Sequence, residues 1–495
     1  MPFKSWVTQP SGSNPPIHIL DDDSLLNIFY LYRPAILVDV DAEVRAGDSS
    51  PPRWGEWTHE RWWHKLSHVC QRWRRLIFAS ASYLGLCLVC TYGTPVARML
   101  ECSPAFPIVL DYTHRTRRWT VEDEDGILLA LQHRAQVRRI RLVFPCSHER
   151  KLFMAIEMEF PMLEYLYIGI SDQEVRPDLK IPHTFQAPRL CHLALTRCPP
   201  LVAFPSLMTS TGLVTLSLLF PSSHCRHNPY DLSRRLSHLS QLVVLRIGVT
   251  DFLEEEQLIP FITPLTLPNL RLFEYAGHTN YLEKLLPCMT TPLLEKLQIT
   301  LLSHLILPNP TYTLLCLLQF MRKAGVLGFG SAKLLFTGSR ATAWVYPREG
   351  ARLYVFYLRI LTRPRGFQVS KMAEIFRNLI PAFSTVVDLT IDYSDCSPLD
   401  ERAGPMQWRD LFRSFDHVKT LCVHGIFAKN MLHSLLSDGE PLPEVLPELQ
   451  VLECPVGCDT SDEFATFVNV RKATGHPICL VLVDSPGRSP AGTGL

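Results

Sequence analysis

The chain has 495 residues, 47% hydrophobic and 20% charged, so it is long enough for more than one domain and too apolar for extended disorder. Its 49 basic and 48 acidic side chains leave a formal net charge of +1, which predicts neither nucleic acid nor a membrane as partner. The 15 cysteines are an odd number in apolar surroundings, as in reducing compartments, and neither a secretory leader nor a membrane-spanning run is recognisable. We therefore expect a cytoplasmic or nuclear protein.

After a flexible tail over 1–16, a first helix is predicted to begin near residue 22. Three aspartates at 21–23 lie where carboxylates cap a helix and complement its dipole. Leu25, Ile28, Phe29 and Tyr32 then recur at helical spacing, which places them on one face.

A loop rich in Pro, Gly and Ser is predicted at about 33–58, followed by a second helix over about 59–79. That helix is amphipathic with an unusually aromatic apolar face, formed by Trp62, Trp63, Leu66, Val69, Cys70, Trp73, Leu76 and Ile77. Two helices cannot bury so many large side chains on each other, so we expect a further surface to cover them.

The rest of the chain repeats one pattern ten times: apolar, two residues, apolar, one residue, apolar. The middle positions are Ile140, Leu166, Leu193, Leu216, Leu245, Phe273, Leu297, Leu389, Leu421 and Leu452. They lie 23 to 32 residues apart, except for one gap of 92 residues. This spacing is at or slightly above the ~20–29-residue period of leucine-rich repeats.

Helical stretches between these patterns predict strand and helix in alternation, which builds a solenoid with a parallel sheet on one face and helices on the other. The expected fold is thus α/β, with a helical domain over 17–88, a leucine-rich-repeat-like array over 89–485 and a flexible tail over 486–495. The array is expected to be irregular at about 300–385, with a helix, a strand and a hairpin around Pro347. Glu164, His192, Thr215 and Lys296 are candidates for an exposed strand face.

The N-terminal helices resemble the F-box family, whose pattern combines a Leu-Pro start, a Leu-Leu-x-Ile-Phe helix and a Val-Cys-x-x-Trp-Arg core. The matching residues are Ile19-Leu20, Leu25-Leu26-Asn27-Ile28-Phe29 and Val69-Cys70-Gln71-Arg72-Trp73-Arg74. Two departures are Asp21, where the family often has Pro, and the long loop. The whole chain looks like the F-box and repeat proteins of mushroom-forming fungi, although beyond residue 88 only the repeat layout is similar.

The resemblance implies a substrate receptor of a ubiquitin ligase: the F-box binds a Skp-type adaptor and through it a cullin, and the repeats bind a target protein. Under it, the adaptor-binding residues are Ile19, Leu20, Leu25, Leu26, Ile28, Phe29, Leu66, Val69, Cys70 and Trp73. Each of them could equally pack the helices onto the first repeats. The alternative function is a repeat scaffold outside any ligase, with the helices as a cap.

Catalytic and metal-binding signatures are weak throughout the sequence. Cys87 and Cys90 form a C-x-x-C without a second pair at zinc-ligand spacing, so we interpret them as core residues. The segment from Gly328 to Lys333 lacks the spacing of a phosphate loop, and the arginines between residues 115 and 141 surround an acidic run. The sequence therefore predicts a protein that is not an enzyme and needs no cofactor.

Overall fold

A computed structural model gives the fold of this protein. It describes residues 19–33, 62–102, 106–113, 119–171, 185–197, 210–220, 229–249, 264–303, 310–326, 328–337, 340–348, 354–362, 368–393, 405–424, 431, 445–455 and 462–483. The two predicted tails and nearly all of the predicted loop at 33–58 lie outside these ranges.

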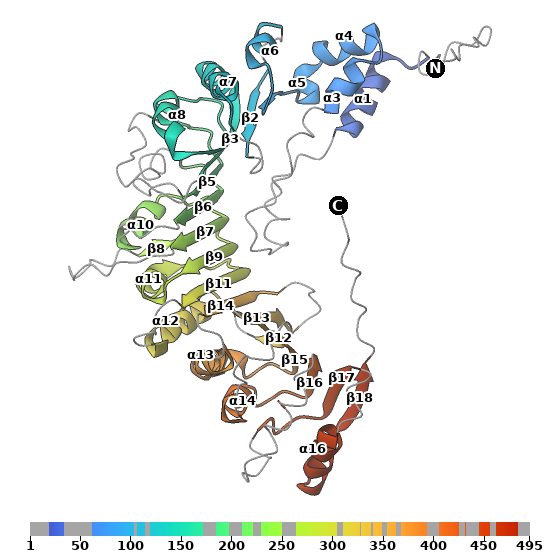
Figure 1. The fold of residues 1–495 in the computed structure, drawn as a ribbon, viewed down its shortest axis with the longest axis vertical. Coiled ribbons are helices and arrows are strands. Elements are labelled where there is room, and N and C mark those ends of the chain that lie inside the picture. The colour runs from blue at the N-terminus through green and yellow to red at the C-terminus, as the bar shows by residue number, and fades with distance from the viewer. Residues whose placement is uncertain are drawn as a thin grey trace.

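The described N-terminal residues form four short helices, and a curved solenoid follows them (Figure 1). The helices are α1 (Asp22–Tyr32), α3 (Trp62–Ser67), α4 (Gln71–Ala79) and α5 (Ala81–Leu84). Gly85 ends α5 with a φ of 61°, a left-handed conformation that glycine adopts without steric cost, and the chain turns there towards the first strand.

A 16-stranded sheet runs the length of the solenoid, in the order β1-β2-β3-β4-β5-β6-β7-β9-β11-β14-β13-β12-β15-β16-β17-β18. Its first nine strands in this order are β1 (Leu88–Thr91), β2 (Ile108–Tyr112), β3 (Val137–Phe144), β4 (Tyr165–Ile170), β5 (His192–Thr196), β6 (Thr215–Phe220), β7 (Val244–Val249), β9 (Leu272–Gly277) and β11 (Lys296–Ser303). The other seven are β14 (Phe356–Thr362), β13 (Arg340–Pro347), β12 (Phe329–Thr337), β15 (Asp388–Tyr393), β16 (Thr420–His424), β17 (Val451–Pro455) and β18 (Cys479–Val483). Two further strands, β8 (Leu265–Thr266) and β10 (Met289–Thr290), pair with each other in a separate two-stranded parallel sheet.

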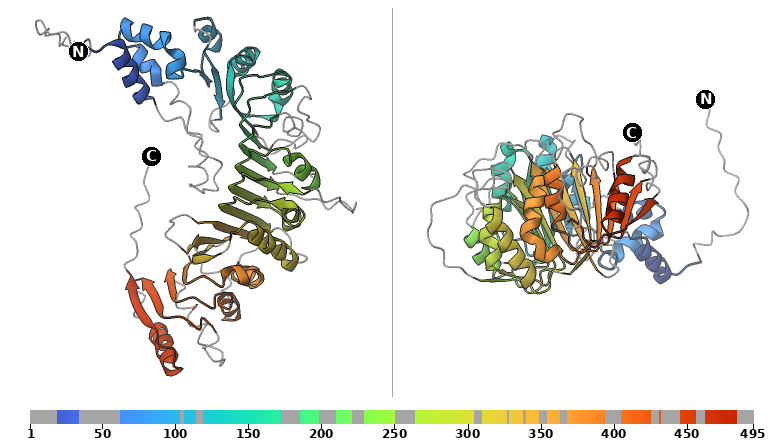
Figure 2. Two further views of the ribbon diagram at one scale, coloured as in Figure 1. Left: turned by 180° about the vertical axis from the view of Figure 1, so that it is seen from behind. Right: turned by 90° about the horizontal axis from the view of Figure 1, so that it is seen from below.

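Helices lie along the outer side of the arc and the sheet lines its inner side, as both side views show (Figures 1 and 2). They are α6 (Val96–Cys102), α7 (Val121–Gln132), α8 (Glu149–Ile156), α10 (Pro229–Leu236), α11 (Thr279–Leu285), α12 (Pro310–Lys323), α13 (Gln368–Phe383), α14 (Pro405–Phe412) and α16 (Asp462–Ala473). Short 3-10 turns cover Cys146–His148 and Leu286–Cys288. The described helices of the array lie on one face of the sheet, and the opposite, inner face is the open face. Several side chains on the open face are nevertheless buried, among them Val109, Arg141 and Arg246. The predicted α/β solenoid is confirmed.

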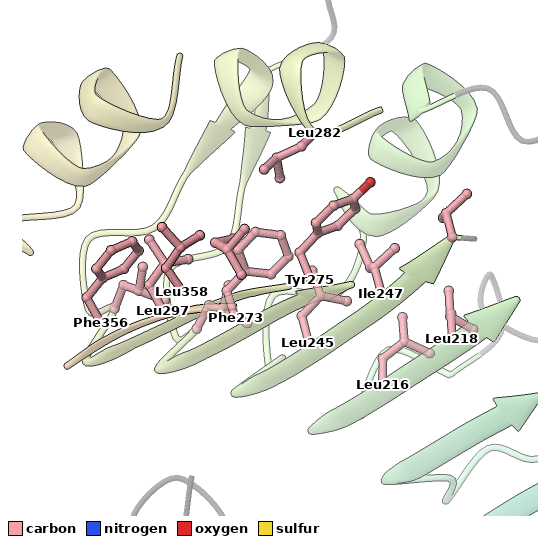
Figure 3. Close-up of a cluster of buried hydrophobic side chains, with 14 of the residues drawn as sticks. Leu216, Leu218, Leu245, Ile247, Phe273, Tyr275, Leu282, Leu297, Phe356 and Leu358 are labelled. Carbon is pink, nitrogen blue, oxygen red and sulfur yellow. The ribbon is translucent and has the colours of Figure 1, made fainter. Parts of the chain in front are cut away.

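The repeated apolar pattern forms a continuous ladder in the core. Ile140 pairs with Leu166, and the pairing continues in register through Leu193, Leu216, Leu245 and Phe273 to Leu297. Leu389, Leu421 and Leu452 are paired in the same way. These side chains point towards the helices and are at most 2% exposed (Figure 3). A period-two strand pattern therefore set the register, because a slip by one residue would turn every leucine to the open face.

The gap of 92 residues in the repeat spacing contains a three-stranded insertion. After α12 the chain forms β12 beside the later strand β15, returns as the antiparallel strand β13, and ends as β14 beside the earlier strand β11. Phe356 and Leu358 of β14 pair with Leu297 and Ile299 and extend the ladder (Figure 3). The predicted helix, strand and hairpin of this irregular segment are all present.

Candidate functional site

The start of α1 is fixed by its aspartates, as the sequence predicted. Asp21 occupies the N-cap, and its Oδ1 accepts a hydrogen bond of 2.6 Å from the backbone amide of Ser24. This bond, made to the charged carboxylate, lowers the pKa of Asp21. The residue that stands where the F-box pattern often has proline therefore serves as a helix cap here.

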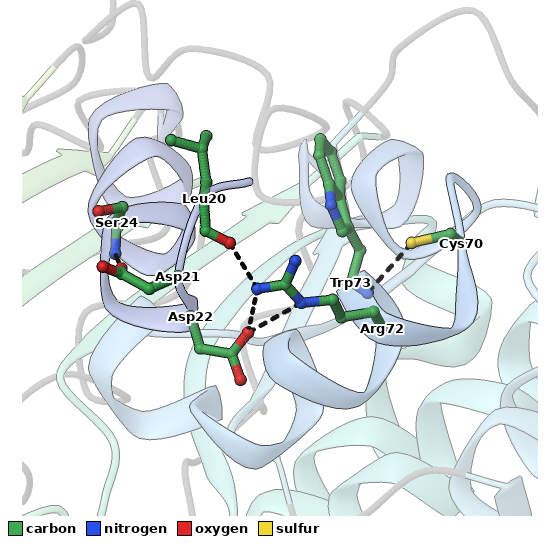
Figure 4. Close-up of polar contacts among 7 residues, drawn as sticks. All are labelled: Leu20, Asp21, Asp22, Ser24, Cys70, Arg72 and Trp73. Carbon is green, nitrogen blue, oxygen red and sulfur yellow. Dashed lines mark hydrogen bonds and ion pairs between the residues drawn. The ribbon is translucent and has the colours of Figure 1, made fainter. Parts of the chain in front are cut away.

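Arg72 ties α1 to α4 (Figure 4). Its Nη2 donates to the carbonyl oxygen of Leu20 at 2.7 Å, and its Nε and Nη2 both donate to Oδ1 of Asp22, at 2.9 and 2.6 Å. One guanidinium thus joins the segment before α1 to the first turn of that helix. These contacts of Arg72 fix the position of α1 relative to α4, and both helices carry F-box-like residues.

Cys70 divides the predicted second helix in two, so the prediction of one helix over 59–79 was wrong. Residues 68–70 leave the helical conformation, and Cys70, with a φ of −157°, becomes the N-cap of α4. Its Sγ accepts a hydrogen bond of 3.5 Å from the backbone amide of Trp73 (Figure 4). A thiol is an unusual cap, which is why the apolar pattern alone predicted continuity.

The predicted adaptor-binding residues divide into three groups by exposure. Leu25 and Phe29 are at most 1% exposed and form the core of the helical part. Leu20, Leu26, Leu66, Cys70 and Trp73 are half-buried, and the first three and Trp73 pack against that core. Ile19, Ile28 and Val69 are exposed by 81%, 45% and 58%. These last three are therefore available to a partner.

The apolar face predicted for α1 is only partly buried. Leu25 and Phe29 face α4 and α5, whereas Ile28 and Tyr32 remain on the surface. Because α3, α4 and α5 are only six, nine and four residues long, they cannot cover the whole circumference of α1.

Exposed large apolar side chains are concentrated in this part of the molecule. Of the sixteen found among the described residues, eight lie between residues 19 and 84, namely Ile19, Ile28, Tyr30, Leu31, Tyr32, Val69, Phe78 and Tyr83. The other eight are spread over the much longer array. A surface of this kind is typical of a protein interface.

The same helices also cap the solenoid. Phe106, just before β2, packs against Trp63 and Phe78, with ring centroids 6.0 Å apart in each case. Leu84 and Leu86 continue the helical core into that of the first strands. Apart from Phe78, which belongs to both, the cap and the exposed apolar surface use different side chains of the same helices.

The open face of the sheet is the second candidate surface. Residues that alternate with the leucine ladder point to it, among them Arg141, Tyr167, Arg246, Glu274 and Tyr357. Nη1 of Arg141 lies 3.4 Å from Oδ2 of Asp111, and Nε of Arg246 lies 2.9 Å from Oε2 of Glu274. The predicted face residues His192, Thr215 and Lys296 begin strands there, and Glu164 lies at its margin, 2.8 Å from Arg138.

Two of these candidates are less exposed than the sequence predicted. Thr215 is 2% and Lys296 is 3% exposed, and the Nζ of Lys296 lies 4.0 Å from the ring centroid of Tyr354. Sequence reasoning missed Trp344, Tyr354 and Tyr357, since it placed no aromatic cluster on this face. The strand alternation around Pro347 could have revealed it, because Trp344 and Tyr357 occupy the positions opposite to the ladder.

Within the described ranges, no group of three or more His, Cys, Asp or Glu side chains could hold a metal ion. None of the described helices is long and apolar enough to cross a membrane. Cys87 and Cys90 are buried in the sheet region, as predicted for core residues.

The comparisons with known proteins add little to this geometry. No family model matches the chain, and no curated protein matches it. Among solved structures it is similar to the leucine-rich repeat-containing protein LegL7 from Legionella pneumophila, at 11% identity over 81% of this chain and 92% of that one, with a TM-score of 0.27. The assignment of a leucine-rich-repeat-like fold therefore rests on the ladder and the parallel sheet described above.

Proposed function

We propose that this protein is the substrate receptor of a Skp-cullin-F-box ubiquitin ligase, with no catalytic residues of its own. The N-terminal helices bind a Skp-type adaptor, and the solenoid binds a target protein. The observation that carries the proposal is the density of exposed apolar side chains on helices that already have a core and already cap the array. Because capping leaves Ile28 and Val69 on the surface, it does not account for them.

The second candidate is a scaffold whose helices serve only as a cap. It is favoured by the packing of Trp63 and Phe78 on Phe106, which closes the first end of the sheet. Under this function, exposed apolar residues such as Ile28 and Val69 have no partner. The two functions thus differ in what a change on the exposed side of the helices does.

The test is binding of a purified Skp-type adaptor to the full chain, measured by isothermal titration calorimetry. The informative variant is Ile28→Lys with Val69→Lys, because both side chains are about half exposed and neither belongs to the core. A matched control is Val121→Lys with Met154→Lys, which alters two exposed apolar residues of the repeat array. Circular dichroism should give the same helix content for all three proteins.

The proposal expects binding by the parent and by the control, with a loss of at least about tenfold in the Ile28 and Val69 variant. Absence of binding by the folded parent would reject the ligase function and favour the capped scaffold. Equal binding by both variants would reject the assigned surface.

A further inference from the structure

The charged side chains that the described strands place on the open face are unevenly distributed along the solenoid. Among the described strand residues that alternate with the ladder, six basic and two acidic side chains lie between β1 and β13 in sheet order, a net charge of +4. They are Arg139, Arg141, Arg246, Lys296, Arg340, Arg359, Asp111 and Glu274. From β12 to β18 there are one basic and three acidic residues, Lys333, Asp388, Asp392 and Glu453, a net charge of −2.

An aromatic cluster lies at the end of the positive part. The ring of Tyr357 is 5.8 Å from that of Trp344 and 5.7 Å from that of Tyr354, between ring centroids. The Nε2 of Gln298 donates to Oη of Tyr354 at 3.1 Å, which joins β11 to the cluster. The indole of Trp344 and the ring of Tyr354 remain partly exposed. The three-stranded insertion thus supplies an aromatic platform on the open face.

Two arginines lie beside this platform. Arg359 follows Tyr357 by two residues on β14, and its guanidinium is 5.4 Å from the centroid of that ring. Arg340, which is exposed, is on the neighbouring strand, four residues before Trp344. At about 3.3 Å per residue, the backbone of Arg359 is about 7 Å along β14 from that of Tyr357. The backbone of Arg340 is about 13 Å along β13 from that of Trp344.

We infer that this part of the open face binds an extended acidic peptide segment of the target protein. An apolar side chain of the peptide rests on Trp344 and Tyr354, and a carboxylate two to four residues away meets Arg359 or Arg340. The inference rests on the proposed function, which assigns the open face to the target. In an extended peptide, residues separated by two or four positions share one face at the spacing found here.

The arrangement favours a peptide over single-stranded nucleic acid. Nucleic acid needs a continuous basic track and open aromatic faces for stacking. Here Tyr357 is only 3% exposed, its ring is packed edge-on against Trp344, and acidic residues replace basic ones from β15 onward. The reversal of charge also orients the partner, because its acidic part avoids the strands from β15 to β17.

The test uses the full chain and fluorescein-labelled 15-residue peptides in a fluorescence anisotropy titration. One peptide carries two copies of Phe-Ser-Glu-Ser-Glu, and a second has Lys in place of each Glu. A third probe is an oligouridine of 12 nucleotides. The protein variants are Arg340→Glu with Arg359→Glu, and separately Trp344→Ala. The charge-matched control is Arg98→Glu with Arg150→Glu, two exposed arginines on α6 and α8 of the helical side.

The expected result is saturable binding of the Glu peptide, weakened at least about tenfold by either open-face variant and unchanged in the control. Asp388→Asn, at the negative end, should leave binding unchanged or strengthen it. Equal binding of the Lys peptide, tighter binding of the oligouridine, or an unaffected arginine variant would overturn the inference. Adaptor binding by the same variants stays intact in every case, so failure here is distinguishable from failure of the ligase function.

Discussion

The ring of Phe29 packs edge-on against the indole of Trp73, with the centroids 4.8 Å apart and the planes at 63°. Phe29 comes from α1 and Trp73 from the first turn of α4, so this contact is the centre of the helical part. Both residues belong to the F-box-like motifs. Their packing role means that they build the surface on which a partner would bind.

Phe29→Ala should unfold or loosen the N-terminal helices. Phe29 is 1% exposed, and removing a buried phenylalanine costs about 3 to 5 kcal/mol in free energy of unfolding, which a small helical unit cannot lose. Hydrogen exchange of residues 19–33 and 62–84 measures the loss of protection. Leu31→Ala, at a side chain that is 82% exposed, should change stability by less than about 0.5 kcal/mol. Unchanged protection in Phe29→Ala would contradict this packing.

His192 should make the array sensitive to mild acid. Burial is the main cause that lowers the pKa of His192 to about 4, and the charge of Arg139 acts in the same direction. Because the unfolded pKa of histidine is about 6.5, the unfolded chain takes up the proton first, and stability falls as the pH drops from about 6.5 to 4.

His192→Gln should flatten the pH dependence of stability in that window. The measurement is urea unfolding of both proteins at several values between pH 4 and pH 7, with a difference of the order of 1 to 3 kcal/mol in how much stability each loses. Glutamine is chosen because its side-chain amide can replace the contact that Nδ1 of His192 makes with Oγ1 of Thr215, at 3.1 Å. Parallel curves for the two proteins would show that His192 titrates normally.

Lys296 should make the stability of the fold depend on pH in the alkaline range. Burial lowers its pKa to about 8, and the nearby Glu274 only partly opposes this. A lowered pKa means that the folded state loses the proton before the unfolded state does, so stability rises as the pH increases from about 8 to 10.5. Lys296→Met should lack this rise and should be more stable than the parent near pH 7. Thermal unfolding of both proteins from pH 7 to pH 10 tests it, and a parent as flat as the variant would refute it.

Arg471 should hold the last repeats together. It is fully buried in α16, and its Nη1 and Nη2 donate to the carbonyl oxygens of Val445 and Leu446, at 3.3 and 3.1 Å. Leu446 has a φ of 54°, an uncommon value for leucine, so the guanidinium stabilises a strained turn. Arg471→Met should cost about 1 to 3 kcal/mol in urea unfolding, whereas Lys472→Met, at an exposed neighbour, should cost little. Equal effects of the two changes would exclude this role.

Much of the fold follows from the sequence because the core is made of one repeated pattern. Each middle leucine, such as Leu166 or Leu421, could be assigned to a strand, and its register followed from the pattern. The order of strands in the insertion could not be predicted. Alternation shows that β12, β13 and β14 are strands, but their neighbours depend on pairings between residues that are far apart in the chain.

The candidate sites were only partly predictable. Motif resemblance identified Ile28 and Phe29 together, but only packing separates the exposed Ile28 from the buried Phe29. The open-face cluster was missed because Trp344 and Tyr357 are 13 positions apart in sequence and meet only through the antiparallel pairing. The uneven distribution of charge on the open face could not be predicted either, because each strand contributes only one or two of the charged residues and these are far apart in sequence.

The insertion between β11 and β15 must contain an odd number of strands. Because β13 is antiparallel to both of its neighbours, β14 and β12 point the same way, so each half of the solenoid meets a parallel strand. Any odd number of meandering strands preserves this polarity, and any even number would reverse it. Lengthening the platform by natural or engineered duplication therefore requires two strands at a time, which would enlarge the aromatic surface without disturbing the repeats on either side.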